Sequence, residues 1–224
     1  MFRADKKSNF QGPHQNQQTA TAGASKENAK AAMILIHGRG ASAQSILTLA
    51  NEFSDPDLHY VAPQANDHQW YPNSFLAPSE KNEPGLSSGL QMIYDLVSDL
   101  GESGIPKEKI IILGFSQGAC LASEFVARHP AKYGGLAALS GGLIGKGDHV
   151  PPDSYSGDLE KTPLFFGCSN IDPHIPKERV DESEEIFNSL NGDVNKKIYK
   201  GMGHTVNEDE ILEIQKLIQN VTEA

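Results

Sequence analysis

The stretch IIILGFSQG at residues 110–118 decides the fold of this chain. Its four consecutive apolar residues predict a strand that is buried on both faces of a parallel sheet. A helical pattern over Ala119–Arg128 follows and stops at a His-Pro pair. Between strand and helix, Gly114 and Gly118 leave room for a strained backbone. The stretch therefore predicts a strand, a sharp turn that exposes Ser116 at the start of a helix, and the helix itself.

The same alternation of strands and helices extends over most of the chain. Short apolar runs predict buried strands, and these are Ala31–Ile36, His59–Ala62, Gly135–Ser140 and Pro163–Gly167. A last strand is expected at Val194–Tyr199, between two predicted helices. Apolar residues at helical spacing predict helices, which run from Ser42 to Phe53 and over Leu86–Leu100, Lys177–Leu190 and Asn207–Asn220. The stretch Gln18–Ala22 favours an antiparallel edge strand. This order predicts a mostly parallel central sheet with helices on both faces. Together with the G-x-S-x-G turn at residues 114–118, it predicts the α/β-hydrolase fold.

The length of 224 residues fits one globular domain, which we expect to span residues 18–224. Residues 1–17 form a polar opening rich in Gln, Asn and Lys, and we expect at least the first dozen residues to be mobile. His14 lies in this opening, where the pattern gives it no role. Length and composition are compatible with a homodimer and do not decide the oligomeric state.

Charge and composition exclude several classes of partner. The chain has 19 Lys and Arg against 29 Asp and Glu, a formal net charge of −10, so its average field repels nucleic acid and anionic membranes. It contains no run of about 18 apolar residues and no signal-peptide pattern, so we expect a cytoplasmic protein without stable membrane insertion. Cys120 and Cys168 indicate neither a disulfide framework nor a zinc site.

A serine becomes a nucleophile only when a base removes its proton, so Ser116 needs a histidine partner. In folds of this type the catalytic residues follow the order Ser, Asp or Glu, His. His204 follows the last predicted strand in the sequence GMGH at residues 201–204, which places it at the carboxyl edge of the sheet. His174, between two prolines, is the alternative and lacks that position. We expect His204 to be the base.

The acid is expected between Ser116 and His204. Asp172 follows the strand predicted at Pro163–Gly167 and so lies at the same carboxyl edge. Three other aspartates compete for this role from a Gly-, Pro- and Ser-rich loop with no strand directly before them, and they are Asp148, Asp153 and Asp158. Asp172 is the expected acid.

Acyl transfer also needs hydrogen-bond donors for the oxyanion, one from the backbone after the nucleophile and one from a loop after an early strand. The backbone N–H groups of Gln117 and Arg39 have these positions, the second within the HGRG loop at residues 37–40. The side chain of Arg39 is not needed for this role.

The long irregular stretch from Gln64 to Pro84 holds the most apolar loop cluster of the chain. Loops of this length are usually functional. Four residues are therefore candidates for the wall of a substrate pocket, and they are Trp70, Tyr71, Phe75 and Leu76. Packing in the core is an equally good interpretation of these side chains.

At these residues the chain resembles the phospholipase/carboxylesterase family of α/β-hydrolases, which includes acyl-protein thioesterases and bacterial carboxylesterases. The resemblance extends from Ala31 to the C-terminus and rests on four ordered blocks, which are HGRG at 37–40, GFSQG at 114–118, Asp172 and GMGH at 201–204. It implies a single-domain esterase without a large lid and without a cofactor, which cleaves esters or thioesters through an acyl-enzyme. It also implies that Ser116, Asp172 and His204 form a catalytic triad.

Two details of the resemblance bear on the substrate. Arg39 stands where the thioesterase branch usually has an apolar residue, and the WYP sequence at 70–72 resembles the bacterial carboxylesterase branch. The resemblance thus implies a serine carboxylesterase for small esters. Lysophospholipase and acyl-protein thioesterase activities are the alternatives.

The sequence disfavours two other classes of protein, a non-catalytic binding protein and a metallohydrolase. A non-catalytic protein of the same fold usually loses the nucleophile or the base, and here neither is missing. A metallohydrolase could use His59, Asp67 and His68 as zinc ligands. Their spacing matches no helix-borne motif such as H-E-x-x-H, so we expect no metal at these residues.

Overall fold

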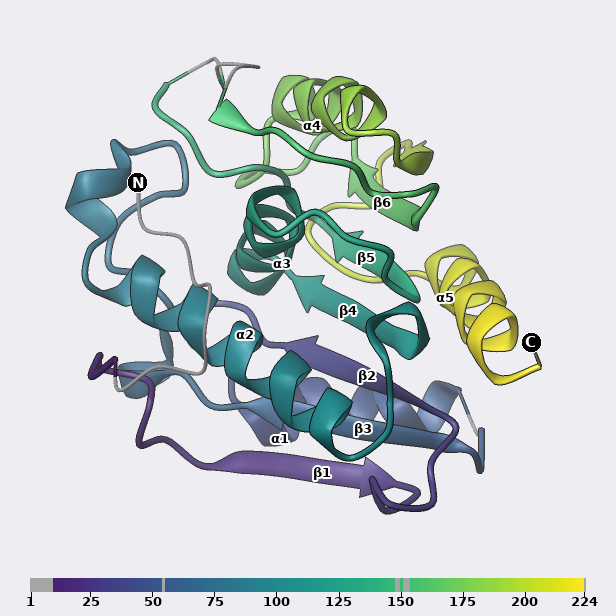
Figure 1. The fold of residues 1–224 in the computed structure, drawn as a ribbon. Helices are drawn as coiled ribbons and strands as arrows, with labels where there is room; N and C mark the ends of the chain where they lie inside the picture. Colours follow the sequence, from purple (N-terminus) through teal and green to yellow (C-terminus); the bar gives the residue numbers. More distant parts are fainter. Residues whose placement is uncertain (1–9, 54, 148–149, 151–153, 224) are drawn as a thin grey trace.

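The computed structural model describes residues 10–53, 55–147, 150 and 154–223. A seven-stranded sheet with the order β1-β3-β2-β4-β5-β6-β7 forms its centre (Figure 1). The strands are β1 (Thr19–Gly23), β2 (Ala31–Ile36), β3 (Leu58–Pro63), β4 (Ile110–Phe115), β5 (Gly135–Leu139), β6 (Pro163–Ser169) and β7 (Asp193–Tyr199). Neighbouring strands are parallel except β1, which pairs antiparallel with β3. The predicted mostly parallel sheet and its antiparallel edge strand are confirmed.

Five α-helices lie among the described residues, and they are α1 (Ala43–Leu47), α2 (Gly85–Glu102), α3 (Gln117–Arg128), α4 (Lys177–Ser189) and α5 (Glu208–Thr222). Ser42 caps α1 through a reciprocal capping box with Ser45, as expected of a serine in that position. The helix predicted to continue to Phe53 is α-helical for only five residues and then tightens into a 3-10 helix at Thr48–Glu52. Helix ends often tighten in this way.

The strands carry apolar side chains on both faces, because helices cover both. On one face Ile34, Ile112 and Phe166 belong to a cluster with side chains of α2, α3 and α4. The neighbouring residues Met33 and Ile111 point the other way, into a cluster with α1 and α5. This period-2 alternation with both faces buried explains why the central strands β2, β4 and β5 appear in the sequence as short apolar runs, whereas the edge strands β1 and β7 contain polar residues.

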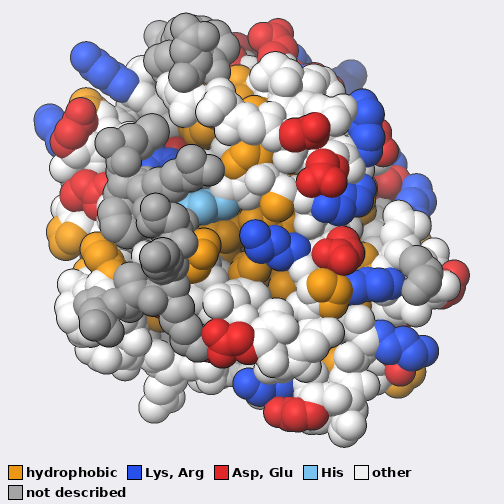
Figure 2. Space-filling model, in the orientation of Figure 1, with side chains coloured by type: hydrophobic (Ala, Val, Ile, Leu, Met, Phe, Trp, Pro, Cys, Tyr) orange, Lys and Arg blue, Asp and Glu red, His pale blue; other side chains and the backbone are white. Residues whose placement is uncertain are grey.

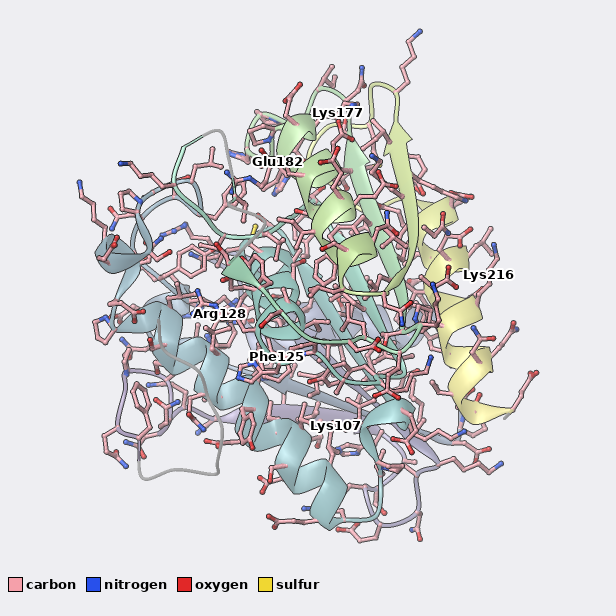
Figure 3. The ribbon with its side chains drawn as sticks, turned by 45° about the horizontal axis from the view of Figure 1, so that its top comes forward. Lys107, Phe125, Arg128, Lys177, Glu182 and Lys216 are labelled. Carbon is pink, nitrogen blue, oxygen red and sulfur yellow. The ribbon has the colours of Figure 1, made fainter. Side chains whose placement is uncertain are left out.

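Helix α3 carries a buried ion pair, whereas the charged side chains seen in Figure 2 lie on the surface. Figure 3 shows Phe125 and Arg128 on α3, between α2 and α4. Arg128 is buried there in an ion pair with Glu124 Oε1, and Glu124 Oε2 accepts hydrogen bonds from Ile144 N–H and from the Tyr155 hydroxyl. On the described surface in Figure 2, acidic and basic side chains are mixed. Within the described chain, no helix has the length and apolar character to cross a membrane.

Parallel strands place the loops that follow them at one edge of the sheet. The carboxyl ends of β2, β4, β6 and β7 therefore bring together residues 37–41, the turn at Ser116, the segment at Asp172 and the loop with His204. Crevices at this edge are the usual ligand sites of open α/β sheets.

Candidate active site

The turn between β4 and α3 holds Ser116 in a strained conformation. Its φ of 56° and ψ of −120° are sparsely populated by residues other than glycine. Both flanking glycines are required, because a Cβ on Gly114 would lie 2.3 Å from Gly118 O and a Cβ on Gly118 would lie 2.1 Å from Ile36 O. The Ser116 N–H donates to Leu139 O on β5 over 2.9 Å. The turn predicted from the sequence is thus formed, with Ser116 at its apex.

Three residues from three different loops meet at this turn. His204 Nε2 lies 2.9 Å from Ser116 Oγ, and His204 Nδ1 lies 2.7 Å from Asp172 Oδ2. An ionised carboxylate only accepts hydrogen bonds, so Nδ1 carries the proton and Nε2 is left to accept from the serine hydroxyl. This arrangement suits proton abstraction from Ser116. The alternative base, His174, instead packs its ring edge-on against His204, with 4.8 Å between the centroids.

The Asp172 side chain is fully buried and hydrogen-bonded through both oxygens. Its Oδ1 accepts from the backbone N–H groups of His174 (2.9 Å) and Ile175 (3.1 Å). Burial raises the pKa of this carboxyl, but the hydrogen bond from His204 and those from the two backbone groups outweigh it, and the net pKa is lowered. Asp172 is therefore ionised at neutral pH.

Of the three competing aspartates, Asp158 belongs to the described residues, and its hydrogen bonds are made away from His204. Asp158 is exposed and accepts hydrogen bonds from Glu160 N–H and from the side-chain amide of Asn191, which lies between α4 and β7. Asp148 and Asp153 lie outside the described residues.

Hydrogen bonds from β6 hold the loop that carries His204. Gly203 N–H donates to Ser169 Oγ over 3.1 Å, and Gly201 N–H donates to Asn170 Oδ1 over 2.8 Å. Asn207 forms the N-terminal capping box of α5, and its side-chain amide also contacts Met202 Sδ. Both ends of the loop are thus tied to regular elements.

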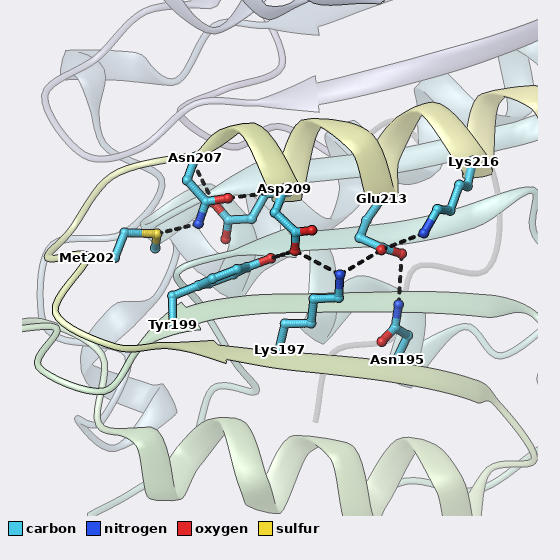
Figure 4. Close-up of polar contacts among 9 residues, drawn as sticks. Asn195, Lys197, Tyr199, Met202, Asn207, Asp209, Glu213 and Lys216 are labelled. Carbon is cyan, nitrogen blue, oxygen red and sulfur yellow. Dashed lines mark hydrogen bonds and ion pairs between the residues drawn. The ribbon is translucent and has the colours of Figure 1, made fainter.

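A polar network joins β7 to α5 just beyond this loop (Figure 4). Lys197 bridges Asp209 (2.7 Å) and Glu213 (2.8 Å), and the Tyr199 hydroxyl donates to Asp209 over 2.7 Å. Asn195 and Lys216 complete the network at Glu213. β7 ends before His204 and α5 begins after it. The network therefore holds together the two elements that the His204 loop connects.

The expected oxyanion donors flank the nucleophile. Gln117 is the first residue of α3, so its N–H has no acceptor within the helix. The 37–40 loop lies against Ser116, since a Cβ built on Gly38 would be 3.3 Å from Ser116 Cβ. Backbone N–H groups beside a serine hydroxyl are the donors that an oxyanion requires, so the 37–40 loop and the start of α3 are the candidate oxyanion segments.

The side chains of Arg39 and Gln117 also bind the loop at residues 69–73, which no sequence pattern predicted. Arg39 donates four hydrogen bonds across the cavity mouth, to Gln69 Oε1 and to the carbonyls of Tyr71, Pro72 and Asn73, at 2.7–3.1 Å. Gln117 accepts from Trp70 N–H (2.9 Å) and donates to Tyr71 O (2.8 Å). The loop at residues 69–73 is therefore fixed to both oxyanion segments.

A cavity of about 530 Å³ opens onto Ser116 and His204. Of the four predicted wall residues, Tyr71 and Phe75 line it and Trp70 and Leu76 do not. Trp70 is fully buried behind the wall, because its indole N–H donates to His37 O over 2.9 Å and holds the ring beneath the loop. Leu76 packs against the main core cluster. The structure thus places Tyr71 and Phe75 in the cavity wall, and Trp70 and Leu76 in the packing behind it.

Other lining residues were not predicted, and they include Phe115, Cys120, His174 and Ile175. Cys120 lies one helical turn after Ser116, which is a signal that the sequence did offer, because residues four apart share a helix face. Burial raises the pKa of Cys120 to about 12, so its sulfur is a neutral thiol in the cavity wall.

The three residues considered as zinc ligands make other contacts. His59 Nδ1 lies 2.7 Å from Ala24 O, and His68 Nδ1 lies 2.7 Å from Ala41 O. Within the described ranges, no group of three or more His, Cys, Asp or Glu side chains is arranged to hold a metal ion.

Comparisons with known proteins show the family of this chain. The family model described as phospholipase/carboxylesterase matches residues 17–222. The acyl-protein thioesterase 1 of Candida albicans is 29% identical over 225 residues, with 89% of this chain and 96% of the relative covered. The enzyme of that name from Saccharomyces cerevisiae is 33% identical over 73% of this chain and 74% of its own length.

Solved structures give the same picture. A crystal structure of a phospholipase/carboxylesterase from Dyadobacter fermentans superposes with a TM-score of 0.87 at 40% identity, over 94% of this chain and 99% of that one. The crystal structure of esterase PE8 superposes with a TM-score of 0.75 at 22% identity, over 92% and 99% of the two chains, and supports the fold.

Proposed function

This chain belongs to the phospholipase/carboxylesterase family of serine hydrolases, and we propose that it cleaves small carboxylic esters with Ser116, His204 and Asp172 as its catalytic triad. One observation carries the proposal: the continuous hydrogen-bond path from Ser116 Oγ through the His204 ring to the buried Asp172 carboxylate. Nucleophile, base and orienting acid are identified by such geometry rather than by position in the sequence.

In the acylation step, Ser116 Oγ attacks the carbonyl carbon of the ester while His204 Nε2 takes the hydroxyl proton. The negative charge that forms on the carbonyl oxygen is stabilised by the N–H groups of Gln117 and Arg39. When the tetrahedral intermediate collapses, the bond to the leaving oxygen breaks, and His204 gives its proton to the departing alcohol. Asp172 remains ionised and stabilises the imidazolium.

In the deacylation step, water attacks the acyl-enzyme and His204 takes one of its protons. The second tetrahedral intermediate collapses with cleavage of the bond to Ser116 Oγ, to which His204 returns the proton. The products are a carboxylic acid and free enzyme. The two-step route replaces one difficult displacement by two easier ones.

The cavity beside Ser116 is the candidate site for the acyl group of the ester. Its apolar side is lined by Tyr71, Phe75 and Ile175, and the Arg39 hydrogen bonds hold the loop at 69–73 against its mouth. A volume of about 530 Å³ is within the usual range for small-molecule sites. The WYP sequence at 70–72 resembles the bacterial carboxylesterase branch, and for this reason we expect kcat/KM to be higher for a butyryl ester than for a palmitoyl thioester.

Acyl-protein thioesterase activity is the second candidate, because several curated relatives carry that name. The same triad attacks a thioester carbonyl equally well, so the preference depends on the pocket. A panel of esters and thioesters of graded acyl length, compared by kcat/KM, separates the two candidates. A palmitoyl thioester as the best substrate would favour the second.

The variant Ser116→Ala tests the nucleophile. Removing one hydroxyl from the turn leaves its backbone intact, and we expect esterase activity to fall by at least about three orders of magnitude with an unchanged circular dichroism spectrum. A variant that keeps more than roughly a tenth of the wild-type kcat would contradict the assignment, because triad residues act as a unit.

A further inference from the structure

The described residues just before β1 pack behind the active site. His14 is 2% exposed. Its N–H donates to Ser88 Oγ on α2 over 2.9 Å, and its ring lies 2.9 Å from Trp70 O and 3.0 Å from Asn66 N. A polar residue of the N-terminal segment is thus buried between α2 and the loop that precedes the cavity wall. The mobility expected for the first dozen residues concerns mostly residues 1–9, which lie outside the described residues.

The contacts of His14 fix its tautomer. Asn66 N–H can only donate, so Nδ1 accepts, and the ring proton therefore resides on Nε2, which donates to Trp70 O. Burial lowers the pKa of His14, against the effect of its hydrogen bonds to backbone carbonyls, and so favours this neutral form. Neutral imidazole supplies one hydrogen-bond donor, for Trp70 O, and one acceptor, for Asn66 N–H.

Trp70 connects His14 to both oxyanion segments. Its ring lies between those of His14 and His37, with centroid distances of 5.2 and 5.1 Å. Its indole N–H donates to His37 O, directly before Gly38 and Arg39, and its backbone N–H donates to Gln117 Oε1. His37 in turn accepts from Ala65 N–H through Nε2 over 3.1 Å. Any displacement of Trp70 is thereby passed to the two loops that supply oxyanion donors.

We propose that His14 is a positioning residue for the oxyanion hole, which acts through Trp70 on the backbone of Arg39 and Gln117. The proposal rests on the function proposed above, since an oxyanion hole has a purpose only in acyl transfer. It assigns a role to the N-terminal segment that its polar composition does not suggest.

The expected effect is on kcat rather than on KM. Loss of the His14 ring nitrogens leaves Trp70 O and Asn66 N–H without these partners in a buried place, which favours a shift of the loop. The oxyanion donors bind charge that exists only in the transition state, so their misplacement lowers kcat while ground-state binding persists. A misplacement of about 1 Å can cost up to about a hundredfold in rate, and for this indirect effect we expect about tenfold.

His14→Phe removes both ring nitrogens and keeps an aromatic ring against Trp70. His14→Gln keeps one donor and one acceptor on a flexible chain, so its expected loss in kcat is smaller, about threefold. The matched control is His129→Phe, because His129 is also buried, with Nδ1 at 3.1 Å from Phe125 O and its ring stacked on Phe125, but lies at the far end of α3. The control variant should lose stability and keep its kcat.

The experiment measures kcat and KM for one activated short-chain ester, the unfolding midpoint, and the fluorescence of Trp70, which is the single tryptophan of the chain. The proposal predicts a lower kcat, a KM within about twofold and a shifted emission maximum for His14→Phe, with wild-type emission for His129→Phe. A wild-type kcat in folded His14→Phe would overturn it. So would an equal loss of kcat in His129→Phe.

Two further measurements keep the outcome interpretable. If His14→Phe does not fold, His14→Gln decides alone, and a wild-type kcat in that variant would refute the proposal. Ser116→Ala is assayed beside them. Full activity in Ser116→Ala would refute the proposed function, whereas an inactive Ser116→Ala together with an unimpaired His14→Phe would refute only the role of His14.

Discussion

Replacing Asp172 by Asn tests the electrostatic core of the proposed triad with almost no change in shape. In the wild-type site, Asp172 Oδ2 accepts from His204 Nδ1 and Oδ1 accepts from two backbone N–H groups. An asparagine can keep its oxygen toward the two backbone donors, and its NH₂ group then faces His204. Two donors cannot pair, so the imidazole is driven toward the tautomer that carries its proton on Nε2 and can no longer accept from Ser116.

The magnitude follows from this reversal. The substitution removes the base in its active tautomer and the negative charge that stabilises the imidazolium, and the same change in a serine protease lowers kcat by about four orders of magnitude. His204 is partly exposed, with 19% of its side chain accessible, so water can relieve some of the mispairing. We therefore expect a loss between about a hundredfold and ten-thousandfold in kcat, with little change in KM.

The assay compares Asp172→Asn with Asp148→Asn, Asp153→Asn and Asp158→Asn on one activated ester, after circular dichroism has shown that each variant is folded. The three control variants should retain near-normal turnover. Near-normal turnover in Asp172→Asn, together with a collapse in one of the others, would refute the reasoning and move the acid to the loop at residues 141–160.

Two further predictions concern the surroundings of the triad. Arg39→Lys should lower kcat/KM almost as much as Arg39→Leu, about tenfold, because an ammonium cannot bridge the four acceptors that the guanidinium reaches; a fully active lysine variant, in the same kinetic assay, would show that charge alone suffices. Burial raises the pKa of Glu210 to about 7, so the folded state binds a proton that the unfolded state releases above its ordinary pKa, and the stability contributed by this group is lost as pH rises from about 4.5 to about 7. Glu210→Gln should therefore raise Tm relative to wild type by a few degrees at pH 8 and by much less at pH 4.5, and thermal unfolding that shows equal shifts at both pH values would contradict the sign of this effect.

The sequence predicted the central strands because β2, β4 and β5 are short apolar runs bounded by turn residues. The edge strands β1 and β7 contain polar residues and were predicted from Thr-Ala alternation and from a place between two helices. The turn at Ser116 was equally predictable from its two glycines. Backbone oxygen atoms of Gly118 and Ile36 approach Gly114 and Gly118 too closely to leave room for a Cβ atom. Asp172 and His204 followed from their places after predicted strands. Local pattern and chain order were sufficient for these features.

Contacts between distant segments could not be predicted in this way. The Arg39 hydrogen bonds span at least thirty residues and those of His14 to Asn66 and Trp70 more than fifty, so no periodicity records them. The place of Trp70 could not be decided from the sequence for the same reason, because an apolar residue in a long loop fits a pocket wall and a buried core position equally well. The partner that decides between the two, His37 O, is known only once the loops are packed.

Covalent labelling with a fluorophosphonate ester tests the central claim most directly. This reagent phosphonylates activated serine hydroxyls, and peptide mass spectrometry locates the modified residue among all the serines of the chain. The account predicts stoichiometric labelling of Ser116, abolished in Ser116→Ala and slowed by at least about a hundredfold in His204→Asn, because the hydroxyl is then without its base. Rapid, inactivating modification of any other serine, or labelling of Ser116 that is unaffected in His204→Asn, would contradict it.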